Sequence, residues 1–101
     1  MKAIIIEPST QVIENIEIES YDDIVKQIGF DTIISDEMDQ GQNRVYFDEE
    51  CFLRGSNGRF QIDNLIPVSG VGVIVGASNE NNSLSNVTTS VDNIQKRLKF
   101  L

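Results

Sequence analysis

Histidine and tryptophan are absent from this sequence of 101 residues, and Cys51 is its one cysteine. Since histidine is the usual general base near neutral pH and the commonest metal ligand, serine–histidine triads and histidine-containing zinc sites are excluded. A single cysteine also excludes an internal disulfide and a CxxC motif. Three acidic residues precede Cys51 in the sequence, and because negative charge disfavours a thiolate, we expect a structural thiol.

Basic residues and long apolar runs are also scarce. The chain carries 8 basic against 16 acidic residues, a formal net charge of −8. Binding to nucleic acid or to anionic lipid needs a basic surface, so we expect neither. The apolar run at residues 3–6 is shorter than the ~7–15 residues of a signal peptide, and no run approaches the ~18–20 of a membrane span. We therefore expect a cytoplasmic protein without a membrane segment.

What is present is the composition of an ordinary globular domain, with 40% hydrophobic and 24% charged residues. Apolar runs and period-two alternation predict strands at residues 2–6, 11–18, 32–35, 44–47, 51–53, 60–62 and 71–75. The stretch 78–90 is rich in Asn, Ser and Thr, and it predicts a flexible surface loop.

Two helices are indicated by apolar spacing and by residues suited to helix ends. Ser20 suits the N-cap of a helix over residues 21–28, and Gly29 suits the left-handed stop that follows it. A second helix is predicted to begin near Ser90. The prediction is one α+β domain over residues 1–101: a curved, mostly antiparallel sheet of five or six strands packed against two short helices.

Negative charge is concentrated in the first half, where residues 1–50 carry 13 acids and 3 bases; residues 51–101 carry 3 acids and 5 bases. Six acids fall around two neighbouring predicted turns: Asp36, Glu37, Asp39, Asp48, Glu49 and Glu50. They are interpreted as solvated turn residues, as a protein-binding face or as a metal site; no EF-hand register fits them. Paired carboxylates acting as acid and base would need a deep pocket, so we expect no enzymatic activity, no bound metal and no cofactor.

Two glycine-containing segments suggest ligand binding. Residues 70–76 resemble a dinucleotide fingerprint, but the third glycine is one residue late and no helix pattern follows, so close backbone packing or strand curvature is favoured. Arg54, Gly55, Gly58 and Arg59 place two guanidinium groups around a glycine turn. This second segment is the candidate site for a small phosphorylated ligand, and the alternative is that each arginine pairs with a nearby acid.

Four segments together resemble a known family. They are MKAIIIEP (residues 1–8), VYFDEECFL (residues 45–53), PVSGVGVIVG (residues 67–76) and IQKRLKFL (residues 94–101). The family comprises small proteins carried by phages, plasmids and their bacterial hosts, and it is catalogued only as a domain of unknown function. It usually has glycine where this chain has Cys51. No catalytic residues come with this resemblance.

The resemblance implies a small accessory protein of a mobile element in a bacterial host. Proteins of this kind often act by binding, so the leading hypothesis is a counter-defence inhibitor that occupies a host protein, plausibly a defence component, through the six acids. The first alternative is a sponge that sequesters a phosphorylated or cyclic nucleotide through Arg54 and Arg59. The second is a structural or assembly protein of the element, which would self-associate as a homo-oligomer.

Overall fold

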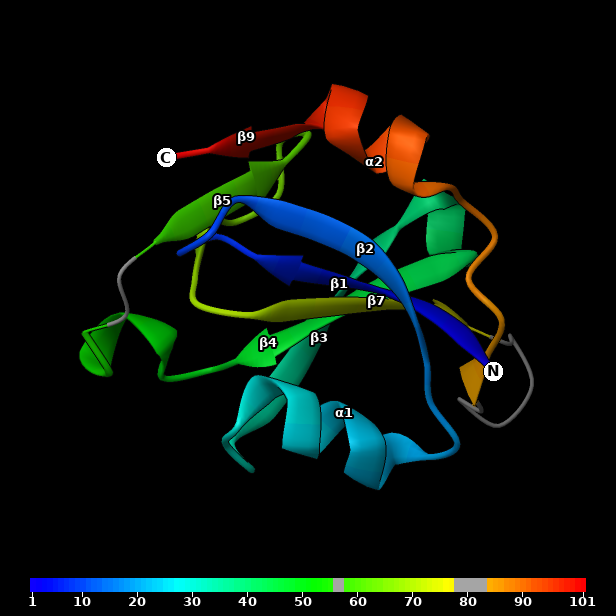
Figure 1. Ribbon diagram of the computed structural model, residues 1–101, viewed down its shortest axis with the longest axis horizontal. Helices are drawn as coiled ribbons and strands as arrows, with labels where there is room; N and C mark the ends of the chain where they lie inside the picture. The colour runs from blue at the N-terminus through cyan, green and yellow to red at the C-terminus, as the bar shows by residue number, and fades with distance from the viewer. Residues whose placement is uncertain (56–57, 78–83) are drawn as a thin grey trace.

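The computed structural model describes residues 1–55, 58–77 and 84–101, and it confirms the α+β class (Figure 1). The strands are β1 (Lys2–Glu7), β2 (Val12–Glu17), β3 (Ile33–Met38), β4 (Asn43–Asp48), β5 (Arg59–Ile62), β6 (Val68–Ser69), β7 (Gly72–Ala77), β8 (Leu84–Ser85) and β9 (Leu98–Phe100). The helices are α1 (Tyr21–Ile28) and α2 (Val91–Arg97), with 3₁₀ helices η1 (Asp39–Gly41) and η2 (Cys51–Leu53).

The larger sheet is made of two hairpins joined by a later strand. Its order is β2-β1-β7-β4-β3, with β8 paired to the end of β7, and each of these pairings is antiparallel. β7 inserts between the β1–β2 and β3–β4 hairpins, so β2 and β3 become the two edges. A smaller antiparallel sheet of order β6-β5-β9 accompanies it. This second sheet was not predicted, because β6 and β9, with two and three residues, are too short to leave a strand pattern in the sequence.

Both faces of the larger sheet are buried, which explains why β1 and β7 are nearly continuous apolar runs. Side chains at alternating positions of β1 enter separate cores: Ala3 and Ile5 pack with α1, while Ile4 and Ile6 pack with residues of the smaller sheet and α2. Figure 1 shows α1 on one side of the sheet and α2 with β5 and β9 on the other. The molecule therefore has three layers.

The helix ends follow the sequence signals with one difference. Gly29 adopts a left-handed conformation (φ 89°) and its N–H donates to the Val25 carbonyl, as predicted. Ser90 caps α2, where its Oγ accepts from the Asn93 N–H (3.1 Å). Ser20 stands at the N-cap of α1 without a side-chain capping bond. Asp23 stabilises this end instead, because its carboxylate accepts from the Glu19 N–H (2.7 Å).

Two sequence predictions are wrong. Residues 51–53 form η2 and not a strand, and the Leu53 side chain is 83% exposed. The stretch 78–90 was predicted to be a flexible loop; residues 78–83 lie outside the described residues, whereas the rest is fixed on the sheet. The Asn86 side chain accepts from the Lys2 N–H (2.8 Å), and the Val87 N–H donates to the Lys2 carbonyl (2.9 Å).

Close packing is confirmed at two glycines of β7. A Cβ on Gly76 would lie 2.1 Å from the Asn86 carbonyl oxygen, and a Cβ on Gly72 would lie 2.5 Å from the Phe60 ring. The missing Cβ therefore leaves room for the Asn86 backbone at Gly76 and for the Phe60 ring at Gly72. Neither helix in the described part of the chain is long and apolar enough to cross a membrane.

Candidate functional site

The β3–β4 hairpin carries the six candidate acids, but the fold separates them. Asp36 and Glu37 are consecutive residues of β3, so their side chains point to opposite faces of the sheet. Glu37 forms an ion pair with Arg44, opposite it on β4, at 3.4 Å. Asp36 has no ion-pair partner among the described residues.

Asp39 lies in η1 and links the β3–β4 hairpin to the last residue of α2. Its carboxylate accepts from Asn43 Nδ2 (2.7 Å) and forms an ion pair with Arg97 at 2.8 Å. Arg97 also makes a forked contact with Asp63, in the turn after β5. The hydrogen bonds that Arg97 donates to the Asp63 carboxylate are the main cause that raises the pKa of the Arg97 guanidinium. Asp39 therefore has a structural role, which sequence reasoning missed because Arg97 is distant along the chain.

Asp48 is 3% exposed and accepts hydrogen bonds at both carboxylate oxygens. Its Oδ1 accepts from the Thr32 hydroxyl (2.6 Å) and from the Glu50 N–H (3.0 Å), while its Oδ2 accepts from Arg54 Nε (3.0 Å). Burial alone would raise the pKa of this carboxyl, but the bonds from Thr32, Arg54 and the Glu50 backbone outweigh burial, and the pKa is lowered. Asp48 therefore stays ionised near neutral pH.

Arg54 completes this network, called here the Asp48–Arg54 network. Its guanidinium pairs with Glu50 (3.2 Å), donates to the Thr32 hydroxyl (3.2 Å) and lies 4.1 Å from the centre of the Phe30 ring. The sequence left open whether the arginines bind a ligand or pair with nearby acids. For Arg54 the structure shows the pairing. The η2 turn folds the chain back, so that Arg54 reaches Asp48 at the end of β4.

The remainder of the predicted anion site is dispersed. Arg59 lies with its guanidinium carbon 5.2 Å from the centre of the Phe52 ring. Gly58 is pressed against the turn after β1, since a Cβ there would lie 2.7 Å from Ser9 N. Gly55 has a left-handed φ of 71°. Residues 56–57, the centre of the predicted turn, lie outside the described residues.

The six acids therefore do not form one continuous face in this fold. Asp48 is buried, Asp39 pairs with Arg97 and Glu50 pairs with Arg54. The other three, Asp36, Glu37 and Glu49, lie along or beside β3. In the described part of the chain, no group of three or more acidic or cysteine side chains is placed to hold a metal ion.

The outer edge of β3 is the feature that sequence reasoning did not identify. The Glu49 N–H donates to the Thr32 carbonyl (2.7 Å), so this residue pair is a hydrogen-bonded one. Bonded and non-bonded pairs alternate in antiparallel strands. The N–H and C=O groups of Ile33, Ser35 and Glu37 therefore point away from β4. We call these outward groups the β3 edge.

Comparisons with protein-family models, with curated proteins and with solved structures find no match to this chain.

Proposed function

We propose that the protein acts by binding a partner protein, which adds a strand to the β3 edge. The observation that carries this proposal is the terminal position of β3 in the sheet, with the backbone groups of Ile33, Ser35 and Glu37 directed outward. Strand addition supplies affinity through main-chain hydrogen bonds and specificity through alternate side chains. It requires no catalytic group.

Natural proteins protect sheet edges with charged side chains, especially lysine, with proline or bulges, or with a covering segment. Of these devices, β3 carries two charged side chains, Asp36 and Glu37. β3 contains neither proline nor lysine, and its six-residue register with β4 runs without a bulge. Its Ile34 side chain is 39% exposed beside this edge. The opposite edge differs, because α2 packs against β2.

Charge determines which kind of strand fits. Asp36 and Glu37 both lie on β3, with their side chains on opposite faces of the sheet. Glu49 is exposed and lies opposite Thr32. An incoming strand with basic residues would meet these carboxylates, while an apolar residue would cover Ile34. A second copy of this chain fits less well, since each copy carries a net charge of −8 and repels the other. The proposed partner is therefore a different protein with a basic and apolar strand.

The resemblance to small proteins of mobile elements supports a bacterial host protein as this partner. In that case we propose that the protein is a counter-defence inhibitor. A defence component that adds a strand to the β3 edge would have part of its own surface covered. This step rests on the resemblance. Binding at the β3 edge rests on the fold and stands independently of it.

Peptide display tests the proposal without a named partner. Random ten-residue peptides are selected against the purified chain, and we expect enrichment of sequences that alternate basic or polar residues with β-branched ones. Ser35→Pro removes an outward N–H and places a ring on the edge. We expect it to weaken the selected peptides at least tenfold, since a backbone hydrogen bond is lost and the ring obstructs approach.

Two control variants separate edge binding from general damage. Ser35→Ala keeps the N–H but loses the hydroxyl that accepts from Arg44 Nε (2.8 Å), and it should bind as the parent does. Asn15→Pro places the same ring on the β2 edge, where the Ile18 N–H to Met1 carbonyl bond implies that the Asn15 N–H points outward. Equal binding by folded Ser35→Pro, or equal loss in Asn15→Pro, would contradict the proposal.

A further inference from the structure

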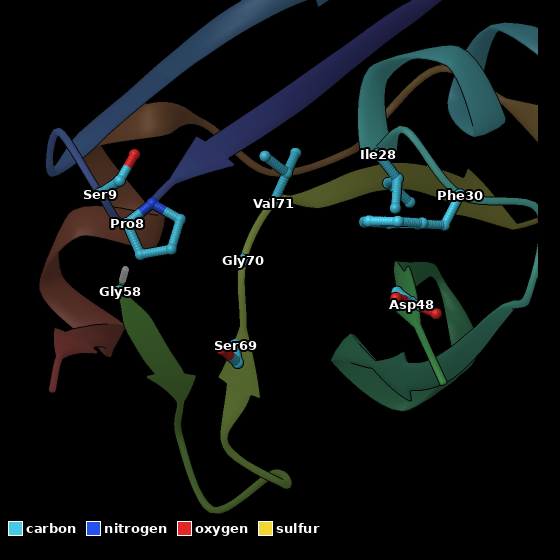
Figure 2. A pocket seen from close by; sticks show the side chains of 9 residues that line it. All are labelled: Pro8, Ser9, Ile28, Phe30, Asp48, Gly58, Ser69, Gly70 and Val71. Atoms are coloured by element: carbon cyan, nitrogen blue, oxygen red, sulfur yellow. The ribbon is translucent and has the colours of Figure 1, made fainter. Parts of the chain in front are cut away.

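A cavity of about 310 Å³ opens at the end of the sheet where β1 and β4 finish. Figure 2 shows the backbone of Gly70 between two walls, with Pro8 on one side and Ile28 and Phe30 on the other. Val71 adds a further apolar side chain to its lining. Pockets that hold small molecules begin at about this volume and are mostly apolar with a few polar groups. This cavity has that composition.

Two buried polar residues also line the cavity: Asp48, which is 3% exposed, and Ser69, which is 5% exposed. A carboxylate oxygen accepts about two hydrogen bonds. Asp48 Oδ1 already accepts from Thr32 and Glu50, whereas Oδ2 accepts from Arg54 alone among the described residues. The second oxygen therefore retains the capacity to accept one further bond, and Asp48 is one of the residues that line the cavity.

We propose that this cavity binds a small, mainly apolar compound that donates an N–H or O–H to Asp48 and carries no anionic group. The apolar part follows from the Pro8, Ile28 and Phe30 side chains in the lining, and the donor follows from the acceptor character of an ionised carboxylate. The exclusion of anions follows from the local charge, because Arg54 is shared between Asp48 and Glu50 and one negative charge remains. A phosphate or carboxylate on the ligand would be repelled by Asp48, so the site differs from the phosphorylated-ligand site suggested by the sequence. The inference does not depend on the proposed strand addition.

Indole and 1-methylindole are suitable probes, because they share a flat shape and only indole has an N–H. Titration of the ¹⁵N-labelled chain is followed through the amide signals of Gly70 and Val71. We expect saturable shifts of these signals with indole and at least tenfold weaker binding of 1-methylindole, the loss that one hydrogen bond to a charged group predicts. Equal affinity of the two probes, or no shift up to the solubility limit of indole, would overturn the inference.

A matched pair of variants locates the site. Ser9 is exposed at the cavity rim, and Ser9→Phe would fill the opening; Thr10 is the next exposed residue of the same turn and does not line the cavity. Folded Ser9→Phe should lose indole binding, whereas Thr10→Phe should keep it. Retained binding in Ser9→Phe would overturn the assignment. Titrations with inorganic phosphate and cyclic AMP complete the test, and saturable shifts at Gly70 with either anion would overturn the preference for a ligand without an anionic group.

Discussion

Replacing Asp48 by asparagine tests whether the Asp48–Arg54 network stabilises the end of β4. The asparagine carbonyl can still accept from Thr32 and from the Glu50 N–H, but its amide nitrogen would face Arg54 Nε, donor against donor. One hydrogen bond to a charged group is lost, and such a bond contributes about 1.5–3 kcal/mol. We expect Asp48→Asn to lower the free energy of unfolding by about that amount, a large share of the usual 5–15 kcal/mol.

Urea unfolding followed by circular dichroism measures this loss. With a slope of about 1–3 kcal/mol/M, the midpoint should fall by roughly 1 M or more. The control is Glu49→Gln, which changes an exposed neighbour and should alter stability by less than about 0.5 kcal/mol. In an Arg54→Met background, Asp48→Asn should cost markedly less, because the lost bond is already absent. A similar cost in both backgrounds would refute the reasoning.

Three further predictions follow from the same structure. The folded pKa of Asp48 lies below its ordinary value of 3.8, so its stabilising effect is complete above that pH and lost as the pH falls through the lower value; urea midpoints of the parent and Asp48→Asn should converge below about pH 3.8. Gly76→Ala should destabilise by about 1–3 kcal/mol in thermal melts, since its Cβ would overlap the Asn86 carbonyl; an unchanged melting temperature would contradict this packing. Asn43→Asp should lower stability by about 1–3 kcal/mol or more at pH 7, because it buries a second carboxylate beside Asp39, and this cost should shrink in acid.

Local features of the fold could be predicted from the sequence because they depend on neighbouring residues. The α1 stop at Gly29 needs only a residue that tolerates positive φ, and the Ser90 cap needs only a hydroxyl before the helix. Residues 51–53 were predicted wrongly as a strand, because a run of three apolar residues is too short to distinguish a strand from a 3₁₀ turn. Phe52 and Leu53 are exposed, so burial did not select a strand there.

Composition does not reveal the contacts of residues 84–90. Buried Asn43 accepts from the Thr88 N–H (3.0 Å) and donates to the Thr88 hydroxyl (2.8 Å). The pairing joins residues 45 positions apart, so no local pattern reveals it.

The candidate site shows the same limit. The sequence identified acids and arginines that do interact, including Asp48 with Arg54, but it could not assign structural roles to Asp39 and Asp48. Their partners and burial follow from the tertiary fold. The position of β3 at a sheet edge also depends on β7 inserting elsewhere. The β3 edge therefore had no signal in the sequence.

Hydrogen exchange measured by NMR, with and without a display-selected peptide, tests binding at the β3 edge most directly. In the free protein, the amides of Ile33, Ser35 and Glu37 should exchange rapidly, while those of Ile34 and Asp36 are protected by β4. The account predicts that saturating peptide slows the three outward amides at least tenfold and leaves Asn15 on β2 unchanged. Unchanged exchange at Ser35 under saturating peptide would contradict strand addition at this edge.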